Sequence, residues 1–197
     1  MKTPNIALPP PLLLAIAYSP SAVRPRLTWL LALDQRLSDV LTRASEPIIA
    51  QLRLSWWRDA LKSEPDDRPK GEPLLADLNK IEHDDALILA GLSLVDAFEI
   101  LATQSDLEAQ SAARAQRISA ICDAYARWAG CAETNRNQIT EVARLWSNTA
   151  GPLPKSLPRI LRPLSILALA ERLANFEHGS TSLNHGLRLN WHAFTGR

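Results

Sequence analysis

Hydrophobic residues recur along this chain at the three- and four-residue spacing of an amphipathic helix, and no long segment shows the alternation of a strand. The first helix predicted in this way runs from Ser21 at its N-cap to about Arg43, with a proline in its first turn. A second begins at Pro47 and continues to about Leu61. The polar, proline-rich residues 63–73 then predict a loop.

Beyond that loop, the same periodicity predicts further helices, with proline and glycine near their ends. They cover residues 84–101, 105–128, 137–146, 160–176 and 183–194. The pair Asp84-Asp85 supplies carboxylates to a helix start, and Gly130 suits a left-handed cap at a helix end. The sum is about eight helices without an internal repeat, which predicts an all-α fold, a helical bundle formed as one domain over residues 1–197.

Composition narrows the function classes. The chain has 197 residues with 22 Lys and Arg against 21 Asp and Glu, so its formal net charge is +1. A balanced charge gives no global electrostatic reason to expect a nucleic acid partner or an acidic membrane surface. The two cysteines, Cys122 and Cys131, are too few for a disulfide scaffold and lack the spacing of a zinc site, which is typical of a reducing compartment.

The N-terminal run of apolar residues, 9–18, is superficially similar to the core of a signal peptide. Three prolines open it, only Lys2 precedes it as a positive charge, and no convincing cleavage site follows. No run of about 18 uninterrupted apolar residues occurs elsewhere, so we expect no transmembrane segment. These features predict a soluble, cytoplasmic protein.

The familiar signatures of catalysis are mostly missing: the chain has no glycine-rich phosphate loop, no HExxH and no GxSxG. Asp34 and Asp39 share one predicted helix, but a separation of five residues turns them about 140° apart, so they do not form one clean metal site. Adjacent Trp56 and Trp57 point about 100° apart on their helix and should pack against two different neighbours. Arg53, four residues before Trp57, can lie over its ring.

Two stretches carry a resemblance to a known family. Residues 30–40, LLALDQRLSDV, are followed by residues 52–61, LRLSWWRDAL, and their order and spacing resemble the squalene/phytoene synthase family. In that family an AFCRxxDDxxD helix precedes a helix with an RLxWWRxxL-like sequence. The resemblance is strong over residues 12–62, weaker to about Gly130, and loose in the last third of the chain.

The resemblance implies an isoprenoid synthase-like helical bundle, shortened at its C-terminal part. It also implies head-to-head joining of two prenyl diphosphates, with magnesium held by two aspartate-rich motifs. This chain departs from the pattern, since only Asp39 keeps a carboxylate of the first motif and the second has no counterpart after Gly130. Ionising a prenyl diphosphate requires several anionic ligands around divalent cations, and one aspartate supplies too few.

Candidate site residues follow from this comparison. Asp39 is the candidate catalytic and magnesium-binding residue. Arg24, Arg36 and Arg53 could bind a diphosphate without a metal, and Trp57 completes the candidate substrate-binding set.

Three functions remain open from the sequence. The favoured one is a degenerate, non-catalytic member of the squalene/phytoene synthase family without a cofactor. It would bind an isoprenoid or prenyl diphosphate, or serve as an assembly module for a protein partner, as the related mitochondrial respiratory complex I assembly factors are thought to do. Peripheral membrane contact is compatible with either role. The second is an active, magnesium-dependent transferase that recruits other carboxylates, for example Asp34, Glu133 or Glu141. The third is an unrelated helical module.

Overall fold

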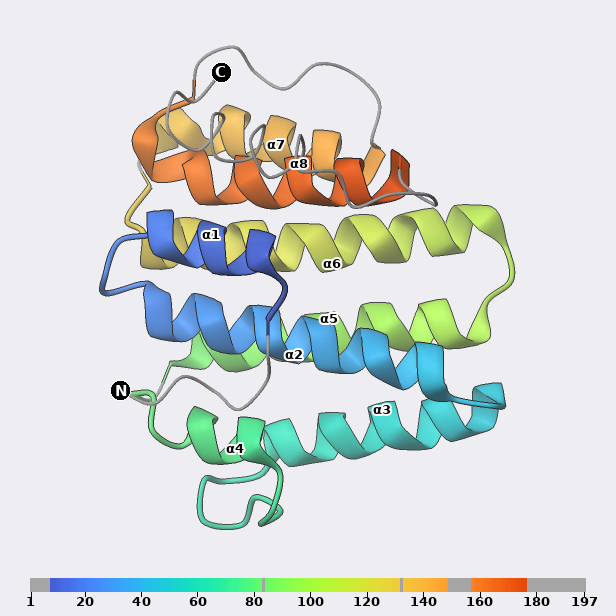
Figure 1. The fold of residues 1–197 in the computed structure, drawn as a ribbon. Helices are drawn as coiled ribbons and strands as arrows, with labels where there is room; N and C mark the ends of the chain where they lie inside the picture. Colours follow the sequence, from blue (N-terminus) through green and yellow to red (C-terminus); the bar gives the residue numbers. More distant parts are fainter. Residues whose placement is uncertain (1–7, 83, 132, 149–156, 177–197) are drawn as a thin grey trace. The chain divides into compact units, whose positions relative to one another are not determined.

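The computed structural model describes residues 8–82, 84–131, 133–148 and 157–176, and in these ranges all regular structure is helical (Figure 1). The α-helices are α1 (Pro10–Tyr18), α2 (Arg24–Arg43), α3 (Pro47–Lys62), α4 (Pro73–Leu78), α5 (Asp85–Thr103), α6 (Leu107–Trp128), α7 (Arg136–Asn148) and α8 (Arg162–Phe176). Short 3-10 turns, η1 (Glu133–Asn135) and η2 (Arg159–Leu161), precede α7 and α8. The all-α class is confirmed. The isoprenoid synthase-like arrangement stays a prediction, and the helix predicted at 183–194 lies outside the described residues.

Contacts divide the chain into two compact units. Unit 1 comprises residues 1–8 and 25–124, and unit 2 comprises residues 9–24 and 125–197. Helix α6 begins in unit 1 and ends in unit 2. The expectation of one domain over residues 1–197 stays a prediction.

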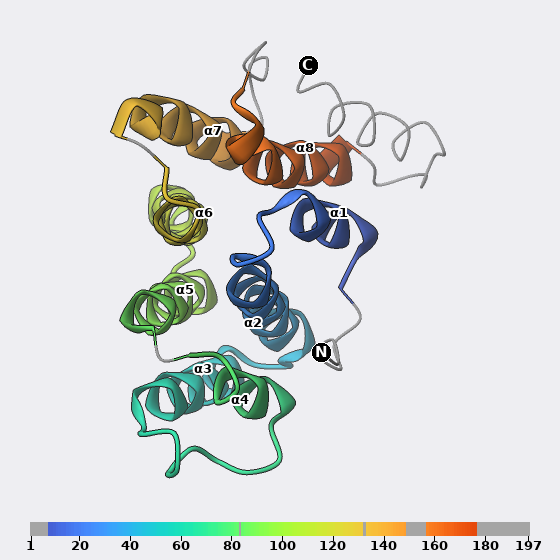
Figure 2. The ribbon, with the colours of Figure 1, turned by 90° about the vertical axis from the view of Figure 1, so that its left-hand side faces the viewer.

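Unit 1 contains α3, α4, α5 and nearly all of α2 and α6. The axes of its long helices lie roughly along one another, parallel or antiparallel (Figures 1 and 2). Helix α3 packs along α5. Gly91 of α5 allows this approach, because a Cβ at that position would lie 3.2 Å from Leu33 of α2 and 3.3 Å from Leu61 of α3. Trp29 of α2 is fully buried, and its indole Nε1 donates to the carbonyl of Leu74 in α4 at 2.8 Å.

A buried ion pair joins α2 to α6 within unit 1. Arg117 donates to both carboxylate oxygens of Asp34, from Nε at 2.5 Å and from a terminal nitrogen at 2.8 Å. Its guanidinium carbon also lies 5.7 Å from the centre of the Phe98 ring of α5. Removing one partner of this pair would leave the other charge buried without compensation, which is costly. Through Asp34, Arg117 and Phe98 the contact joins α2, α6 and α5.

The helix ends carry the stop and start signals that the sequence shows. The Asp84 carboxylate accepts hydrogen bonds from the backbone N–H groups of Ala86 and Leu87 and so caps α5. The same carboxylate pairs with Arg26 at 2.7 Å. Gly130 has a φ of +63° after α6, where a left-handed residue ends a helix at little cost to glycine. Both predictions at these ends are confirmed.

The predicted loop after α3 is present, and it gives way to α4 at Pro73. Arg68 anchors this loop, since it is buried and donates to Asn79 Oδ1 at 2.5 Å. Burial lowers the pKa of the Arg68 guanidinium below its ordinary value. Neither α4 nor α1 was predicted from the sequence pattern, because each is short and lies in proline-rich sequence.

One helix among the described residues, α5, is long and apolar enough to cross a membrane by length and composition. It also packs along α3 and carries Asp96 and Glu99, which pair with Arg58 of α3. A core helix of a soluble protein passes the same test of length and composition. The structure is therefore compatible with the predicted soluble protein.

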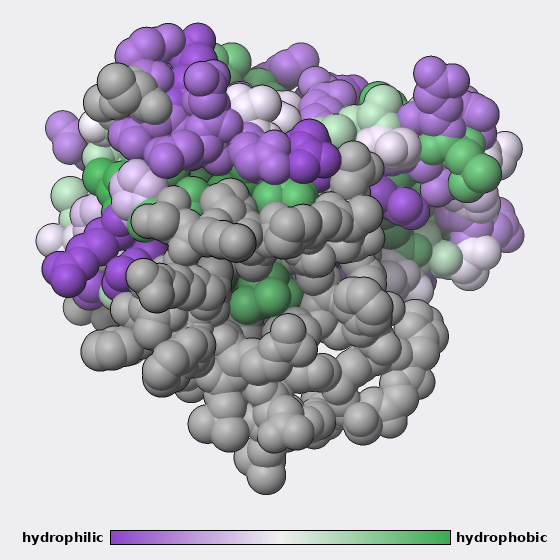
Figure 3. Space-filling view, turned by 90° about the horizontal axis from the view of Figure 1, so that it is seen from above, coloured by the Kyte–Doolittle hydropathy of each residue, from purple (hydrophilic) through white to green (hydrophobic). Residues whose placement is uncertain are grey.

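Unit 2 contains α1, α7 and α8, and α8 packs against both of the others. Helix α7 is amphipathic, with Ile139, Val142, Leu145 and Trp146 buried at helical spacing. Trp146 donates from its indole nitrogen to Glu171 of α8 at 2.8 Å. Seen from the side of these helices, hydrophilic side chains cover much of the coloured surface, with hydrophobic ones in smaller groups (Figure 3).

Tyr125 provides a test of unit 2. It is fully buried and donates from its hydroxyl to the Ile160 carbonyl at 2.6 Å, and burial raises its pKa above the ordinary value. We expect Tyr125→Phe to lower the free energy of unfolding by about 1 kcal/mol at neutral pH, because the hydrogen bond is lost. Because the pKa of Tyr125 is higher in the folded state, its neutral hydroxyl contributes fully to stability below the unfolded pKa of about 10. This contribution is lost as the pH rises further.

The difference in free energy of unfolding between wild type and Tyr125→Phe should therefore become smaller above a pH of about 10. Denaturant titrations at several pH values will measure it. Tyr18→Phe is the control, since Tyr18 is exposed. A gap that stays constant into alkaline pH would contradict the buried, hydrogen-bonded hydroxyl.

Candidate functional site

An open pocket of about 490 Å³ in unit 1 brings together most of the predicted site residues. Asp39, Arg36, Arg53 and Trp57 all line it. The other lining residues are Val40, Arg43, Leu52, Trp56 and Glu72. Helices α2 and α3 therefore supply all of the lining except Glu72, which caps α4. We call this the α2–α3 pocket.

Helical spacing explains which side chains of each helix reach the pocket. On α2, Arg36, Asp39, Val40 and Arg43 follow one another at steps of three, one and three residues, so they share one face. On α3, the pairs 52–56 and 53–57 are each separated by four residues, so these four side chains lie along the part of the helix that borders the pocket.

The charges of the pocket are mostly paired. Arg36 donates to Glu72 at 2.9 Å, and Arg43 lies 3.4 Å from Asp39, four residues before it on the same helix. Arg53 is exposed and forms no hydrogen bond or ion pair with any of the described residues. Three arginines and two carboxylates leave one net positive charge, and it falls to Arg53. The pocket can therefore accept an anionic group without breaking an existing ion pair.

The two tryptophans meet edge to face, with ring centres 5.2 Å apart and planes at 82°. Trp57 is buried, as predicted. Trp56 is 40 % exposed, so the prediction that both rings pack between helices is wrong for Trp56. The physical reason is the 100° turn between adjacent residues, which carries only Trp57 into the core and leaves Trp56 at the mouth of the pocket.

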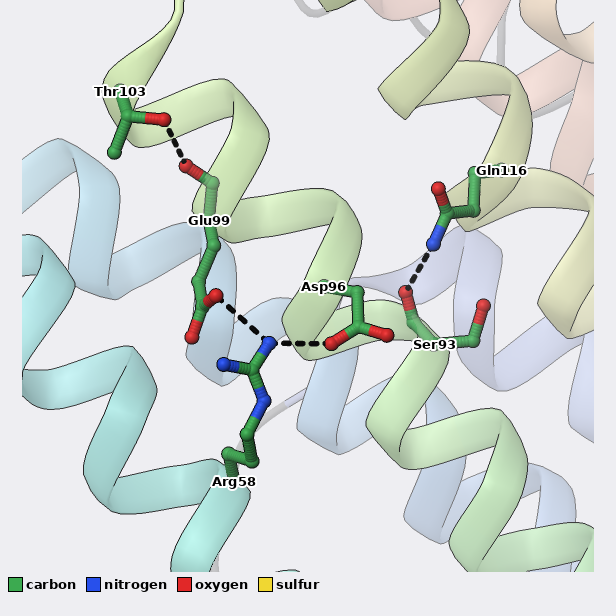
Figure 4. A network of polar contacts seen from close by, with 6 residues as sticks. All are labelled: Arg58, Ser93, Asp96, Glu99, Thr103 and Gln116. Carbon is green, nitrogen blue, oxygen red and sulfur yellow. Dashed lines mark hydrogen bonds and ion pairs between the residues drawn. The ribbon is translucent and has the colours of Figure 1, made fainter.

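Arg58, the last residue of the WWR sequence, lies outside the pocket and holds α3 against α5 (Figure 4). One of its terminal nitrogens donates to Asp96 at 2.5 Å and to Glu99 at 2.8 Å. The hydrogen bond to Asp96, followed by the one to Glu99, raises the pKa of the guanidinium against the opposing effect of burial. Since Arg53 and Arg58 are five residues apart, they point about 140° away from each other, and one side of α3 is anchored while the other lines the pocket.

Arg24, the remaining predicted binding residue, does not line the α2–α3 pocket. It belongs to unit 2, where its guanidinium donates to the carbonyls of Ser19 and Ala17, each at 2.9 Å. These carbonyls lie at the end of α1, so Arg24 caps that helix from the side of its C-terminus.

The carboxylates that could have replaced a lost magnesium motif are engaged elsewhere. Asp34 is held by Arg117, Glu133 pairs with Arg136 at 2.8 Å, and Glu141 pairs with Arg144 at 2.7 Å. Within the residues that the structure describes, no three His, Cys, Asp or Glu side chains come together in a way that could hold a metal ion.

Two charged residues of the pocket, Arg43 and Glu72, were missed by sequence reasoning. Arg43 follows Asp39 by four residues, a spacing that signals an ion pair along a helix. Glu72 lies 36 residues from Arg36 in a segment predicted as a loop, and only the folded structure places it beside α2. Both residues neutralise charges that would otherwise be available to a ligand or a metal.

No family model, no curated protein and no solved structure matches the chain. The resemblance to the squalene/phytoene synthase family therefore rests on the residues themselves.

The different burial of the two tryptophans can be tested by truncation. Trp57→Ala should lower the free energy of unfolding by about 3–5 kcal/mol, because a large buried ring is lost. Trp56→Ala should cost only about 1 kcal/mol, close to the value of an edge-to-face contact. Urea titrations followed by circular dichroism will measure both, and equal losses would contradict the assignment of one ring to the core and one to the mouth.

Proposed function

We propose that the α2–α3 pocket binds the diphosphate group of an isoprenoid and that the protein does not turn this ligand over. The observation that carries the proposal is the guanidinium of Arg53, which has no partner among the described residues, beside the Trp56–Trp57 pair. A cation next to an apolar aromatic surface matches the two halves of a prenyl diphosphate, which is anionic at one end and hydrocarbon along the rest. Charge-assisted hydrogen bonds from arginine to phosphate oxygens are among the stronger polar contacts in proteins.

Size and lining support this ligand class. A volume of about 490 Å³ falls within the usual range for small-molecule pockets, roughly 300–1,000 Å³. Val40, Leu52 and the two rings supply apolar surface, while the arginines gather at the same opening. Arg36 also lines the pocket, and its guanidinium has further N–H donors besides the one bonded to Glu72.

Binding without turnover is favoured by how the carboxylates are used. Departure of pyrophosphate requires divalent cations, which for magnesium means several anionic oxygen ligands around each ion. In the pocket only Asp39 and Glu72 carry carboxylates, and both are engaged by arginines. Asp39 remains the residue that would hold magnesium if the protein were active.

Membership of the squalene/phytoene synthase family, as a divergent member of the branch that includes the respiratory complex I assembly factors, is part of the proposal. The motif order and the gathering of four family-derived site residues in one pocket support it. A cytoplasmic location is also part of the proposal, supported by Cys122 and Cys131 being free thiols. An isoprenoid bound without consumption would let the protein serve as a sensor or an assembly module for a protein partner.

The first experiment is a calorimetric titration with farnesyl diphosphate in the absence of magnesium. Arg53→Gln should weaken binding by about tenfold or more, the loss typical of a hydrogen bond to a charged group. Arg127→Gln is the matched control, because Arg127 is also exposed and lies in α6 outside the pocket. Equal affinities of wild type and Arg53→Gln for farnesyl diphosphate would show that the ligand does not bind in this pocket through Arg53.

The second experiment asks whether the ligand is consumed. Incubated with farnesyl or geranylgeranyl diphosphate and Mg²⁺, the protein should release no pyrophosphate above background and form no squalene or phytoene. Turnover that Asp39→Asn abolishes would establish the active transferase instead and overturn the non-catalytic assignment.

A further inference from the structure

Helix α3 carries an exposed row of large hydrophobic residues. Ile48, Leu52 and Trp56 are 52 %, 63 % and 40 % exposed, and they follow one another at four-residue steps. Each step of four turns the helix by only about 40°, so the three side chains form a continuous line along it. We call this line the apolar stripe. The other large exposed hydrophobic residues of the described ranges lie on other helices: Leu13, Tyr18, Leu89 and Leu107.

The stripe lies away from the core side of the same helix. Ala50, Leu54, Trp57 and Leu61 are buried, so α3 already has a complete apolar face packed within unit 1. Exposed hydrophobic residues scattered singly need no explanation, but a contiguous set is unusual on the surface of a soluble protein. The stripe is therefore a second apolar face on a helix that needs only one for folding.

The extent of the stripe argues against a stable protein partner. With about 150–250 Å² for each large side chain, the exposed fractions correspond to roughly 300 Å² of apolar surface. A standard protein interface buries about 800 Å² on each partner. Projecting leucine, isoleucine and tryptophan side chains on one convex helix suit insertion among lipids, where no matching surface has to be supplied.

The residues beside the apolar stripe are of the kinds that contact lipid headgroups. Arg43, whose side chain is 73 % exposed, and exposed Arg53 line the pocket together with Leu52 and Trp56. Tryptophan is enriched at the boundary between hydrocarbon and headgroups, and arginine side chains reach from apolar positions to phosphates. Glu46 and Asp59 are exposed near the ends of the stripe, so insertion rather than net charge supplies most of the attraction.

We propose that the apolar stripe docks the protein on a membrane surface containing anionic phospholipids. Ile48, Leu52 and Trp56 enter the boundary between headgroups and acyl chains, and Arg43 and Arg53 contact lipid phosphates. Because Leu52 and Trp56 also line the α2–α3 pocket, docking turns the mouth of the pocket towards the bilayer. The docking surface depends only on the exposed stripe and the arginines beside it, and its use in taking up a membrane-borne isoprenoid is the part that rests on the proposed function.

The test is flotation of the full chain with vesicles made of equal parts phosphatidylcholine and phosphatidylglycerol, without any isoprenoid. Ile48→Glu should reduce vesicle binding by about tenfold or more, as expected when one large aliphatic side chain can no longer be buried. Leu89→Glu is the matched control, because Leu89 is 64 % exposed on α5 and should stay within about twofold of wild type. Circular dichroism melts confirm that both variants fold.

Three results would overturn the docking surface. The first is wild-type protein that does not float with these vesicles. The second is an equal loss in Ile48→Glu and Leu89→Glu. A dimer found by sedimentation that Ile48→Glu dissociates, without vesicle binding, would likewise assign the stripe to a protein contact instead. Ile48 does not line the pocket, so Ile48→Glu should still bind soluble farnesyl diphosphate, and failure of either proposal can be told apart from failure of the other.

Discussion

The arrangement of unit 1 depends on how closely α5 approaches α2 and α3 at Gly91. A Cβ there would lie 3.2–3.4 Å from side-chain atoms of Leu33, Leu61 and Trp29, so three helices meet at a position where a side chain would press against its neighbours. This contact lets the helices approach closely. Ala50, Leu54, Trp57 and Leu61 form the face of α3 that is buried within unit 1, and Arg58, paired with Asp96 and Glu99, adds a polar link from α3 to α5. Together they place Arg53, Trp56 and Trp57 opposite the face of α2 that carries Arg36 and Asp39.

Ion pairing decides what this pocket can do. Arginines engage both of its carboxylates, and Arg117 withdraws Asp34 from any role as a metal ligand. Of the three arginines in the pocket, Arg53 is the one without a partner in the part of the chain that the structure describes, and it is next to aromatic and aliphatic surface. Ionising a prenyl diphosphate requires carboxylates that are free to hold magnesium, whereas binding an anionic lipid requires only a free cation and an apolar wall. The pocket meets the second requirement with residues on two rigid helices.

Much of the fold could be predicted from periodicity. The spacing of apolar residues predicted α2, α3, α5, α6, α7 and α8 within a few residues of their ends, because amphipathic helices and their caps are encoded locally. Helices α1 and α4 were missed, since nine and six residues hold too few turns to show a period. The grouping of Arg53 with Trp57, and of Arg36 with Asp39, was also readable, because residues three or four apart share a helix face.

What could not be predicted is set by contacts between distant parts of the chain. Asp34 and Arg117 are 83 residues apart, and nothing local indicates that they pair. The same holds for Glu72 beside Arg36. The exposure of Trp56 depends on which side of α3 is buried, and Ala50, Leu54, Trp57 and Leu61 form that side. Sequence patterns describe helix faces, whereas tertiary packing chooses among them.

A crystal structure of the protein with farnesyl thiodiphosphate, an analogue that resists ionisation, would show whether the α2–α3 pocket binds a prenyl diphosphate through Arg53 and without magnesium. We expect the thiodiphosphate within hydrogen-bond distance of Arg53, the farnesyl chain against Trp56 and Trp57, and the Arg36–Glu72 and Asp34–Arg117 pairs intact. A ligand bound elsewhere would contradict the account, as would magnesium ions in the pocket with Asp39 and Glu72 released from their arginines.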